Sequence, residues 1–298
     1  MKHFQIKNIL IPTDFSKTGL LALEHASFMA RLYKANLYLM HVIEITENTF
    51  DIYSPVIQIK NLDEIEKIAL NQLATLATRL KKEYNIKATI LCSRGNISAE
   101  IVTAVTNNDI DLVVMGTHGA KGFNEFFIGS NAHKTVTVCP CPVITVQSHA
   151  KKLGFTDIVL PIDDTLYSRQ KTDYAITLAK KYGSRIHILG LIEKNGTTDP
   201  NKFKIKLDSI EKMVKKAGLA YDCKTIKDGN LAEAAMKYSK KIKAALIVIL
   251  TGHESDITGM FLGAFAKQIV NHSRVPVMSI HSMEGIYEPI SLAAANPF

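Results

Sequence analysis

The chain contains an internal repeat, and this repeat limits the possible fold more than any other feature of the sequence. Residues 10–14 (LIPTD) return as residues 159–163 (VLPID), at an offset of 149. Residues 95–97 (GNI) return as residues 229–231 (GNL), at an offset of 134, so the second copy is 15 residues shorter than the first. A chain of 298 residues has the length of about two domains. We therefore expect two domains of the same fold.

Within each copy, short apolar runs alternate with segments of helical periodicity. This alternation is typical of α/β proteins in which a parallel sheet is doubly wound, with helices on both faces. In the first copy we expect strands at residues 8–12, 36–42, 87–92, 111–116 and 142–146, and helices at residues 16–33, 62–84, 98–107 and 130–138. The sequence thus predicts a five-stranded parallel sheet in residues 1–148, a second in residues 155–283, and a tail at 284–298 without a counterpart in the repeat.

The longest predicted helix, residues 62–84, has apolar side chains close to one stripe. These are Ile65, Ile68, Leu73, Leu76 and Leu80. Because an amphipathic helix buries its apolar stripe, we expect them in the core and not on a partner surface. The residues missing from the second copy correspond to part of the segment 43–60, which follows the second strand on the ligand side of such a sheet. That segment could act as a lid or pack passively against the neighbouring half.

The composition excludes several classes of protein. The chain is 47% hydrophobic and 21% charged, as is usual for globular proteins. It has no apolar run of membrane-spanning length, and its first ten residues have too short an apolar region for a signal peptide, so we expect a cytoplasmic protein without membrane contact. The four cysteines contain no CxxC pair and the ten histidines no HxxxH pair, which argues against metal ligation by side chains. We interpret Cys139 and Cys141, on either side of Pro140, as small residues between a helix and a strand.

Positive charge is concentrated in the second copy. Residues 1–148 contain 14 basic and 13 acidic residues, whereas the remainder contains 22 and 15. Six lysines gather on one predicted helix: Lys202, Lys204, Lys206, Lys212, Lys215 and Lys216. We interpret them as a solvated helix face. Without interleaved aromatic residues or a nucleic-acid motif, the sequence does not favour nucleic-acid binding.

A glycine-rich loop follows the fourth predicted strand. Residues 111–130 read DLVVMGTHGAKGFNEFFIGS, and the next predicted helix begins at Ser130. Glycine lets the backbone approach a ligand closely, and the free N–H groups at a helix start attract negative charge. The segment therefore predicts an anion site, with phosphate as its natural ligand.

The spacing of the loop residues is more informative than the glycines alone. Gly116, Gly119, Gly129 and Ser130 fit the pattern G-x2-G-x9-G-[S/T] without a mismatch. This resembles the nucleotide-binding motif of the ATP-binding branch of the universal stress protein family. The resemblance implies two tandem Rossmann-like domains of the adenine nucleotide alpha hydrolase type, with ATP as the cofactor, with or without Mg²⁺.

The resemblance also implies a role for each matching position. In the family, the end of the first strand and the backbone after the second hold adenine, which implicates Pro12, Thr13, Asp14 and Val42. The nucleoside would lie near Met115 and Gly116. The phosphates would be held by Gly119, Gly129, Ser130 and Asn131, and His118 and Lys121 could approach their oxygens.

Some of these positions have a structural alternative. Asp14 could bind the base or cap the first helix, and Ser130 could cap the helix that it begins. His133 and Lys134, in the same helix, are interpreted as solvent-facing. We assign no catalytic residue, because the sequence offers no evident acid and base pair.

The second copy departs from the motif. At the offset of 134, Gly116 becomes Leu250, Gly119 becomes His253 and Ser130 becomes Ala264. Realignment could place Gly252 in the first slot, but the second glycine and the hydroxyl would still be missing. We therefore expect that the C-terminal half does not bind ATP in the family manner, although Asp163 remains.

The resemblance implies a stress-response or signalling module that responds to adenine nucleotide through its N-terminal domain. The alternatives are a slow ATPase or nucleotidyl transferase and an interaction scaffold without nucleotide. Because family members commonly dimerise through the fifth strand, the two halves could pair with each other through residues 142–146 and 275–280, or the chain could form a homodimer.

Overall fold

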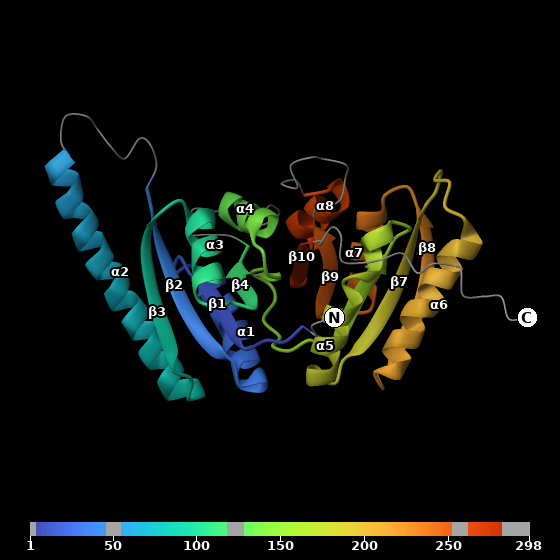
Figure 1. Cartoon of the computed structure of the whole chain (residues 1–298), viewed down its shortest axis with the longest axis horizontal. Coiled ribbons are helices and arrows are strands. Elements are labelled where there is room, and N and C mark those ends of the chain that lie inside the picture. The colour runs from blue at the N-terminus through green and yellow to red at the C-terminus, as the bar shows by residue number, and fades with distance from the viewer. Residues whose placement is uncertain (1–3, 46–54, 118–127, 252–261, 282–298) are drawn as a thin grey trace, which may run out of the picture.

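The protein is an α/β structure built on a single sheet of ten strands (Figure 1). The computed structural model describes residues 4–45, 55–117, 128–251 and 262–281. The elements of the first half are β1 (Asn8–Pro12), α1 (Lys17–Tyr33), β2 (Asn36–Glu44), α2 (Pro55–Tyr84), β3 (Ala88–Gly95), α3 (Ile97–Asn107), β4 (Leu112–Gly116), α4 (Ser130–Val138) and β5 (Val143–Val146). Those of the second half are β6 (Asp157–Ile162), the 3₁₀ helix η2 (Leu166–Arg169), α5 (Thr172–Tyr182), β7 (Arg185–Glu193), α6 (Pro200–Lys216), β8 (Tyr221–Asp228), α7 (Leu231–Lys241), β9 (Leu246–Thr251), α8 (Ala264–His272) and β10 (Val277–His281).

The strand order is β3-β2-β1-β4-β5-β10-β9-β6-β7-β8, so the halves have the same topology. Within each half all neighbouring strands are parallel, which confirms the predicted doubly wound α/β fold. The halves meet at β5 and β10, which run antiparallel with Ile144 opposite Met278. One sheet therefore runs continuously through both copies of the repeat.

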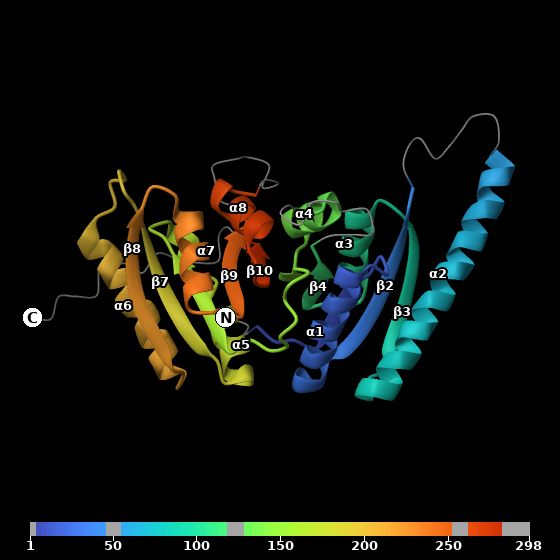
Figure 2. The ribbon, with the colours of Figure 1, turned by 180° about the vertical axis from the view of Figure 1, so that it is seen from behind.

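Helices cover both faces of the sheet (Figures 1 and 2). One core contains Leu23 of α1, Leu73 of α2, Leu178 of α5 and Ile210 of α6. The other core contains side chains of α3, α4, α7 and α8. Each strand supplies both cores, because successive side chains point to opposite faces. Each core spans both halves, so the burial of apolar surface also holds the halves together.

Aromatic side chains pack where α1 of the first half faces α5 of the second. The rings of Phe28 and Tyr182 have centroids 6.0 Å apart, and Tyr182 is also 5.1 Å from the ring of Phe155. His25 Nε2 lies 2.6 Å from the carbonyl oxygen of Ala150, in the connection between the halves. Burial raises the pKa of Tyr182. These side-chain contacts therefore join the two halves in addition to the β5–β10 pairing.

The buried face of α2 differs from the predicted stripe. Leu62, Ala69, Leu73 and Leu80 are buried, whereas Ile65 and Ile68 are 46% and 54% exposed. The assignment of Ile65 and Ile68 to the core is therefore wrong. The buried residues recur at intervals of seven and four along α2, and this periodicity rotates the core face away from both isoleucines. No helix within the described ranges is long and apolar enough to cross a membrane.

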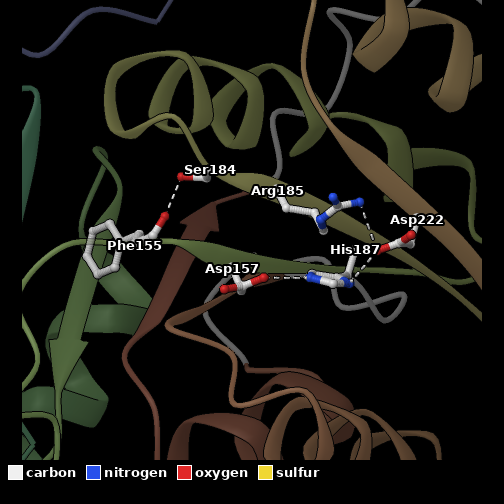
Figure 3. A network of polar contacts seen from close by, with 6 residues as sticks. All are labelled: Phe155, Asp157, Ser184, Arg185, His187 and Asp222. Carbon is white, nitrogen blue, oxygen red and sulfur yellow. Dashed lines mark hydrogen bonds and ion pairs between the residues drawn. The ribbon is translucent and has the colours of Figure 1, made fainter.

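A polar network joins the starts of β6, β7 and β8 (Figure 3). His187 Nε2 lies 3.0 Å from Asp157, and its Nδ1 lies 3.4 Å from Asp222. Arg185 forms an ion pair with the same Asp222, and Ser184 Oγ donates to the carbonyl of Phe155. These contacts lie at the amino ends of the strands, away from the edge where a doubly wound sheet binds ligands.

The revised register of α2 is tested by truncating one buried and one exposed apolar residue. We expect Leu73→Ala to lower the free energy of unfolding by about 2–5 kcal/mol, because it removes a fully buried side chain and leaves a cavity. Ile68→Ala should change it by about 1 kcal/mol or less, since that side chain is half exposed. Urea denaturation of both variants measures the difference. An equal cost for the two variants would contradict the register.

Candidate functional site

The ends of three strands meet at the point where the strand order reverses. β1 lies between β2 and β4, and Pro12, its last residue, is opposite Met40 of β2. Thr13 continues this alignment by donating its N–H to the carbonyl of Met40 at 2.8 Å. β2 runs on to Glu44, so Val42 lies beyond the end of β1. Crevices at such points are where doubly wound sheets bind ligands.

The turn from β1 to α1 is held by side chains of its own residues. Asp14 Oδ1 accepts from Ser16 N–H at 3.1 Å, and Thr13 Oγ1 accepts from Phe15 N–H at 3.1 Å. The residue that caps α1 is Ser16, whose hydroxyl accepts from Gly19 N–H at 3.1 Å. The alternative in which Asp14 caps the helix is therefore wrong. Asp14 is instead exposed at the carboxyl edge of the sheet.

Two rings that the sequence analysis did not single out lie beside each other here, one in this turn and one on β2. Phe15 has a φ of 63°, an unusual value for a bulky residue. Its ring lies 4.7 Å from that of His41, whose Nδ1 is 2.7 Å from the carbonyl oxygen of Thr13. A positive φ at phenylalanine has no sequence signature, so this pair could not be found from the pattern. The two rings give the edge an aromatic surface beside Thr13.

The glycine-rich loop leaves β4 and returns to the same place. Thr117, the residue after β4, donates its N–H to the carbonyl of Val146 at 3.0 Å. Its own carbonyl accepts from Gly129 N–H at 2.6 Å. The first and last parts of the motif, separated by 12 residues of sequence, are thus adjacent in space. His118, Gly119 and Lys121 lie outside the described residues.

The start of α4 lies at this closure. Gly129 is its N-cap and has no side chain to satisfy the first N–H groups, and Ser130 is the first helical residue. The alternative in which Ser130 caps the helix is therefore wrong. Ser130 is exposed and Asn131 is half-buried. The first N–H groups of a helix lack intrahelical partners and carry partial positive charge, so this end of α4 can receive an anion.

The basic residues of α4 lie on different sides of the helix. Lys134 is exposed, as predicted, but His133 is half-buried. Burial lowers the pKa of His133, and Lys267 of α8 lowers it further. His133 is therefore less open to solvent than Lys134, and its interpretation as a solvent-facing residue is not confirmed.

Gly116 has a packing role that does not depend on a ligand. A Cβ at this position would lie 3.0 Å from the carbonyl carbon of Thr18 and 3.1 Å from the nitrogen of Gly19. The absence of a side chain lets the first turn of α1 approach the end of β4. Met115, the preceding residue, is buried and pairs with Thr145 of β5.

The equivalent edge of the second half is filled by lysines. Lys206 of α6 donates from Nζ to the carbonyls of Asp163 and Thr165, at 3.1 and 2.8 Å. Lys171 is only 3% exposed, and its Nζ is 3.4 Å from Ser168 Oγ, which accepts from Asp163 N–H. Lys206 is thus an exception to the predicted solvated lysine face. The place that corresponds to the Asp14 edge is occupied by the protein's own ammonium groups.

The two lysines and Asp163 form one electrostatic unit. Burial lowers the pKa of Lys171 to about 8, although Asp163 acts in the opposite direction. Burial alone would raise the pKa of Asp163, but Lys171 and hydrogen bonds from Thr165 and Ser168 outweigh it and lower that pKa. Burial also lowers the pKa of Lys206. Asp163 is therefore engaged with internal cations.

The helices that follow the first strand of each half begin at different distances from that strand. α1 begins three residues after Asp14, whereas α5 begins nine residues after Asp163, and η2 occupies the interval. The close approach that requires Gly116 in the first half involves the start of α1. Leu250 stands at the corresponding position in the second half, where a helix of this kind begins later. In neither half do the described residues bring together three or more His, Cys, Asp or Glu side chains in a way that could hold a metal ion.

The fold and this edge define a tandem, doubly wound α/β protein whose two carboxyl edges carry different side chains, with lysines bonded at the second. A model of the universal stress protein family matches residues 5–147 and again residues 154–281. The chain belongs to this family. It is 30% identical to universal stress protein MJ0577 of Methanocaldococcus jannaschii over 155 residues, which is 47% of this chain and 94% of that protein. It is 26% identical to MJ0531 of the same organism, over 49% of this chain and 85% of that protein.

A solved structure shares the tandem architecture. The universal stress protein of Archaeoglobus fulgidus DSM 4304 superposes with a TM-score of 0.72 and covers 95% of this chain and 98% of its own, at 21% identity. This similarity supports the fold and not the ligand.

The packing role of Gly116 is tested by adding one methyl group. We expect Gly116→Ala to lower the free energy of unfolding by about 1–3 kcal/mol in the absence of nucleotide, because backbone atoms of α1 must move. Gly229→Ala is the control, since a Cβ there meets no atom within 4 Å. Thermal and urea unfolding measure both. A neutral Gly116→Ala would show that the start of α1 adapts without cost.

The buried Lys171 predicts a pH dependence of stability. Its folded-state pKa of about 8 lies below the ordinary value of 10.5, so between these pH values the unfolded chain binds more protons. The contribution of Lys171 to the free energy of unfolding should therefore rise as the pH increases from 8 towards 10.5. Lys171→Met removes this contribution, and we expect a smaller slope of stability against pH than in the parent protein.

Urea denaturation at pH 7.5, 8.5 and 9.5 measures this slope. Lys215→Met, at an exposed position on α6, is the matched control and should keep the parent slope. Equal slopes for Lys171→Met and the parent protein would contradict the burial of a titrating amine.

Proposed function

We propose that the N-terminal half binds ATP at the carboxyl edge formed by β1, β2 and β4. Thr13, Asp14 and the backbone of Val42 would hold the base, with Pro12 at the strand end. Met115 and Gly116 would lie near the nucleoside. The phosphates would meet Gly119 and the start of α4, at Gly129, Ser130 and Asn131.

The observation that carries this proposal is the hydrogen bond from Gly129 N–H to the carbonyl of Thr117. It brings the uncapped start of α4 beside the end of β4, where the loop with Gly119 begins. A triphosphate extending from the edge at Asp14 would therefore reach the main-chain donors at the start of α4. The exposure of Asp14 supports its assignment to the base, because Ser16 already caps α1.

The second half would not bind ATP in this way. Lys171 and Lys206 occupy the edge around Asp163, and Leu250 and Ala264 replace the glycine and the hydroxyl of the first half. We infer that the chain acts as a stress-response or signalling module with one nucleotide site, in which the second half completes the sheet and core. The predicted domains, 1–148 and 155–283, would then work as an internal pair joined through β5 and β10.

The proposal is tested by calorimetric titration with ATP. We expect one site per chain, and Ser130→Ala should weaken binding about tenfold to a hundredfold, because it removes a hydrogen bond to a charged group. Gly119→Val should abolish binding, since a branched side chain would block the approach of the phosphates. Thr78→Ala, which removes a hydroxyl from the exposed face of α2, is the matched control and should bind like the parent.

Two results would contradict the proposal. One is the absence of ATP binding by the parent chain, which would favour a scaffold. The other is binding that survives in Gly119→Val and is lost when residues around Asp163 are changed. Phosphate or AMP release during long incubation with ATP separates a binding protein from a slow ATPase or nucleotidyl transferase.

A further inference from the structure

Two cysteines lie in contact at the far end of α4. Cys139 is the C-cap of this helix, and Cys141 comes two residues later, just before β5. Their Sγ atoms are 3.6 Å apart, within hydrogen-bonding distance for sulfur. Cys139 is 2% exposed, and Cys141 is half-buried beside the same core. The two thiols therefore face each other at the end of α4, and Cys141 is the less buried residue of the two.

The pair differs from the other cysteines in the chain. Cys92 and Cys223 are on separate strands, β3 and β8, in different halves of the protein. Burial raises the pKa of both, and that of Cys223 reaches about 12 with a further contribution from Glu211. In contrast, the hydrogen bond with Cys141 lowers the pKa of Cys139. The thiolate is the reactive form of cysteine, and Cys139 has a second sulfur in contact with it. This pair can therefore close a disulfide that Cys92 and Cys223, on opposite edges of the sheet, cannot form with each other.

We propose that Cys139 and Cys141 form a redox-active dithiol that hydrogen peroxide converts to an intramolecular disulfide. The Cys139 thiolate attacks one peroxide oxygen, which gives a sulfenic acid and hydroxide. The Cys141 thiol then attacks the sulfenic sulfur, the S–S bond forms and water leaves. In total, two thiols lose two hydrogen atoms and one hydrogen peroxide becomes two water molecules. The separation of 3.6 Å means that the sulfurs approach by a small movement of side chains.

The test is the oxidation of the reduced full-length chain by a small excess of hydrogen peroxide, followed by alkylation in denaturant and peptide mass mapping. Trypsin releases both cysteines in one peptide, residues 135–151. We expect this peptide to lose the mass of two hydrogens and to carry no alkyl group, while Cys92 and Cys223 are alkylated. The count of free thiols should fall from four to two and return to four with dithiothreitol.

Cysteine variants show in which order the sulfenic acid and the disulfide form. In Cys141→Ser, we expect peroxide to leave a sulfenic acid on Cys139 that dimedone traps, and no disulfide in the peptide. Cys223→Ser is the matched control and should form the Cys139–Cys141 disulfide at the parent rate. We expect the pair to oxidise about tenfold faster than Cys92 or Cys223.

Equal rates for all four thiols, or a disulfide between any other pair, would overturn the proposal. Mapping of the parent chain gives this answer even where a serine variant folds poorly. The readout is thiol chemistry alone, so the result does not depend on whether the chain binds a nucleotide.

Discussion

The antiparallel pairing of β5 with β10 is the interaction on which the rest of the architecture depends. Each half alone would be a five-stranded parallel sheet with an open edge at its fifth strand. Unpaired strand edges leave backbone groups unsatisfied and invite association with other chains. When the two edges bond to each other, both are covered, and the cores on the two faces become continuous across the join. The packing of Phe28 of α1 against Tyr182 of α5 adds a further apolar contact between the halves.

The two halves share this topology but differ in the residues and helix starts at the carboxyl edges of their strands. In the first half α1 begins soon after Asp14, and Gly116 lets the first turn of α1 approach the end of β4. Gly129, the N-cap of α4, bonds to Thr117 at the end of β4. In the second half α5 begins later, and two lysines bond at the edge around Asp163. The ammonium groups donate to two carbonyls and a hydroxyl, and Lys171 lowers the pKa of the Asp163 carboxyl. The same topology thus supports one edge beside the uncapped start of a helix and one edge where two lysines bond around Asp163.

Much of the fold could be predicted from the sequence, because it depends on features that the chain repeats. The alternating apolar runs gave the strands within a few residues, and the repeat gave two domains of one topology. The motif spacing and the family resemblance pointed to the ends of β1, β2 and β4, which are neighbouring strands in the sheet. The details that failed depend on tertiary contacts. The rotation of α2 that exposes Ile65 is decided by the sheet beneath it, and the positive φ of Phe15 is decided by the turn around Thr13. The partners of Lys206 come from elements more than forty residues away in sequence.

The covalent connection between the halves has an evolutionary consequence. In a symmetric homodimer every substitution occurs twice, once in each subunit, so a change that fills one site fills both. Here the two copies are encoded separately within one chain, and a residue such as Leu250, which stands where the first copy has Gly116, affects one edge only. The second copy can therefore accumulate changes that suit its own interior while the first keeps its exposed edge. A gene duplication of this kind can produce one chain with approximate twofold symmetry, in which the two carboxyl edges evolve different functions.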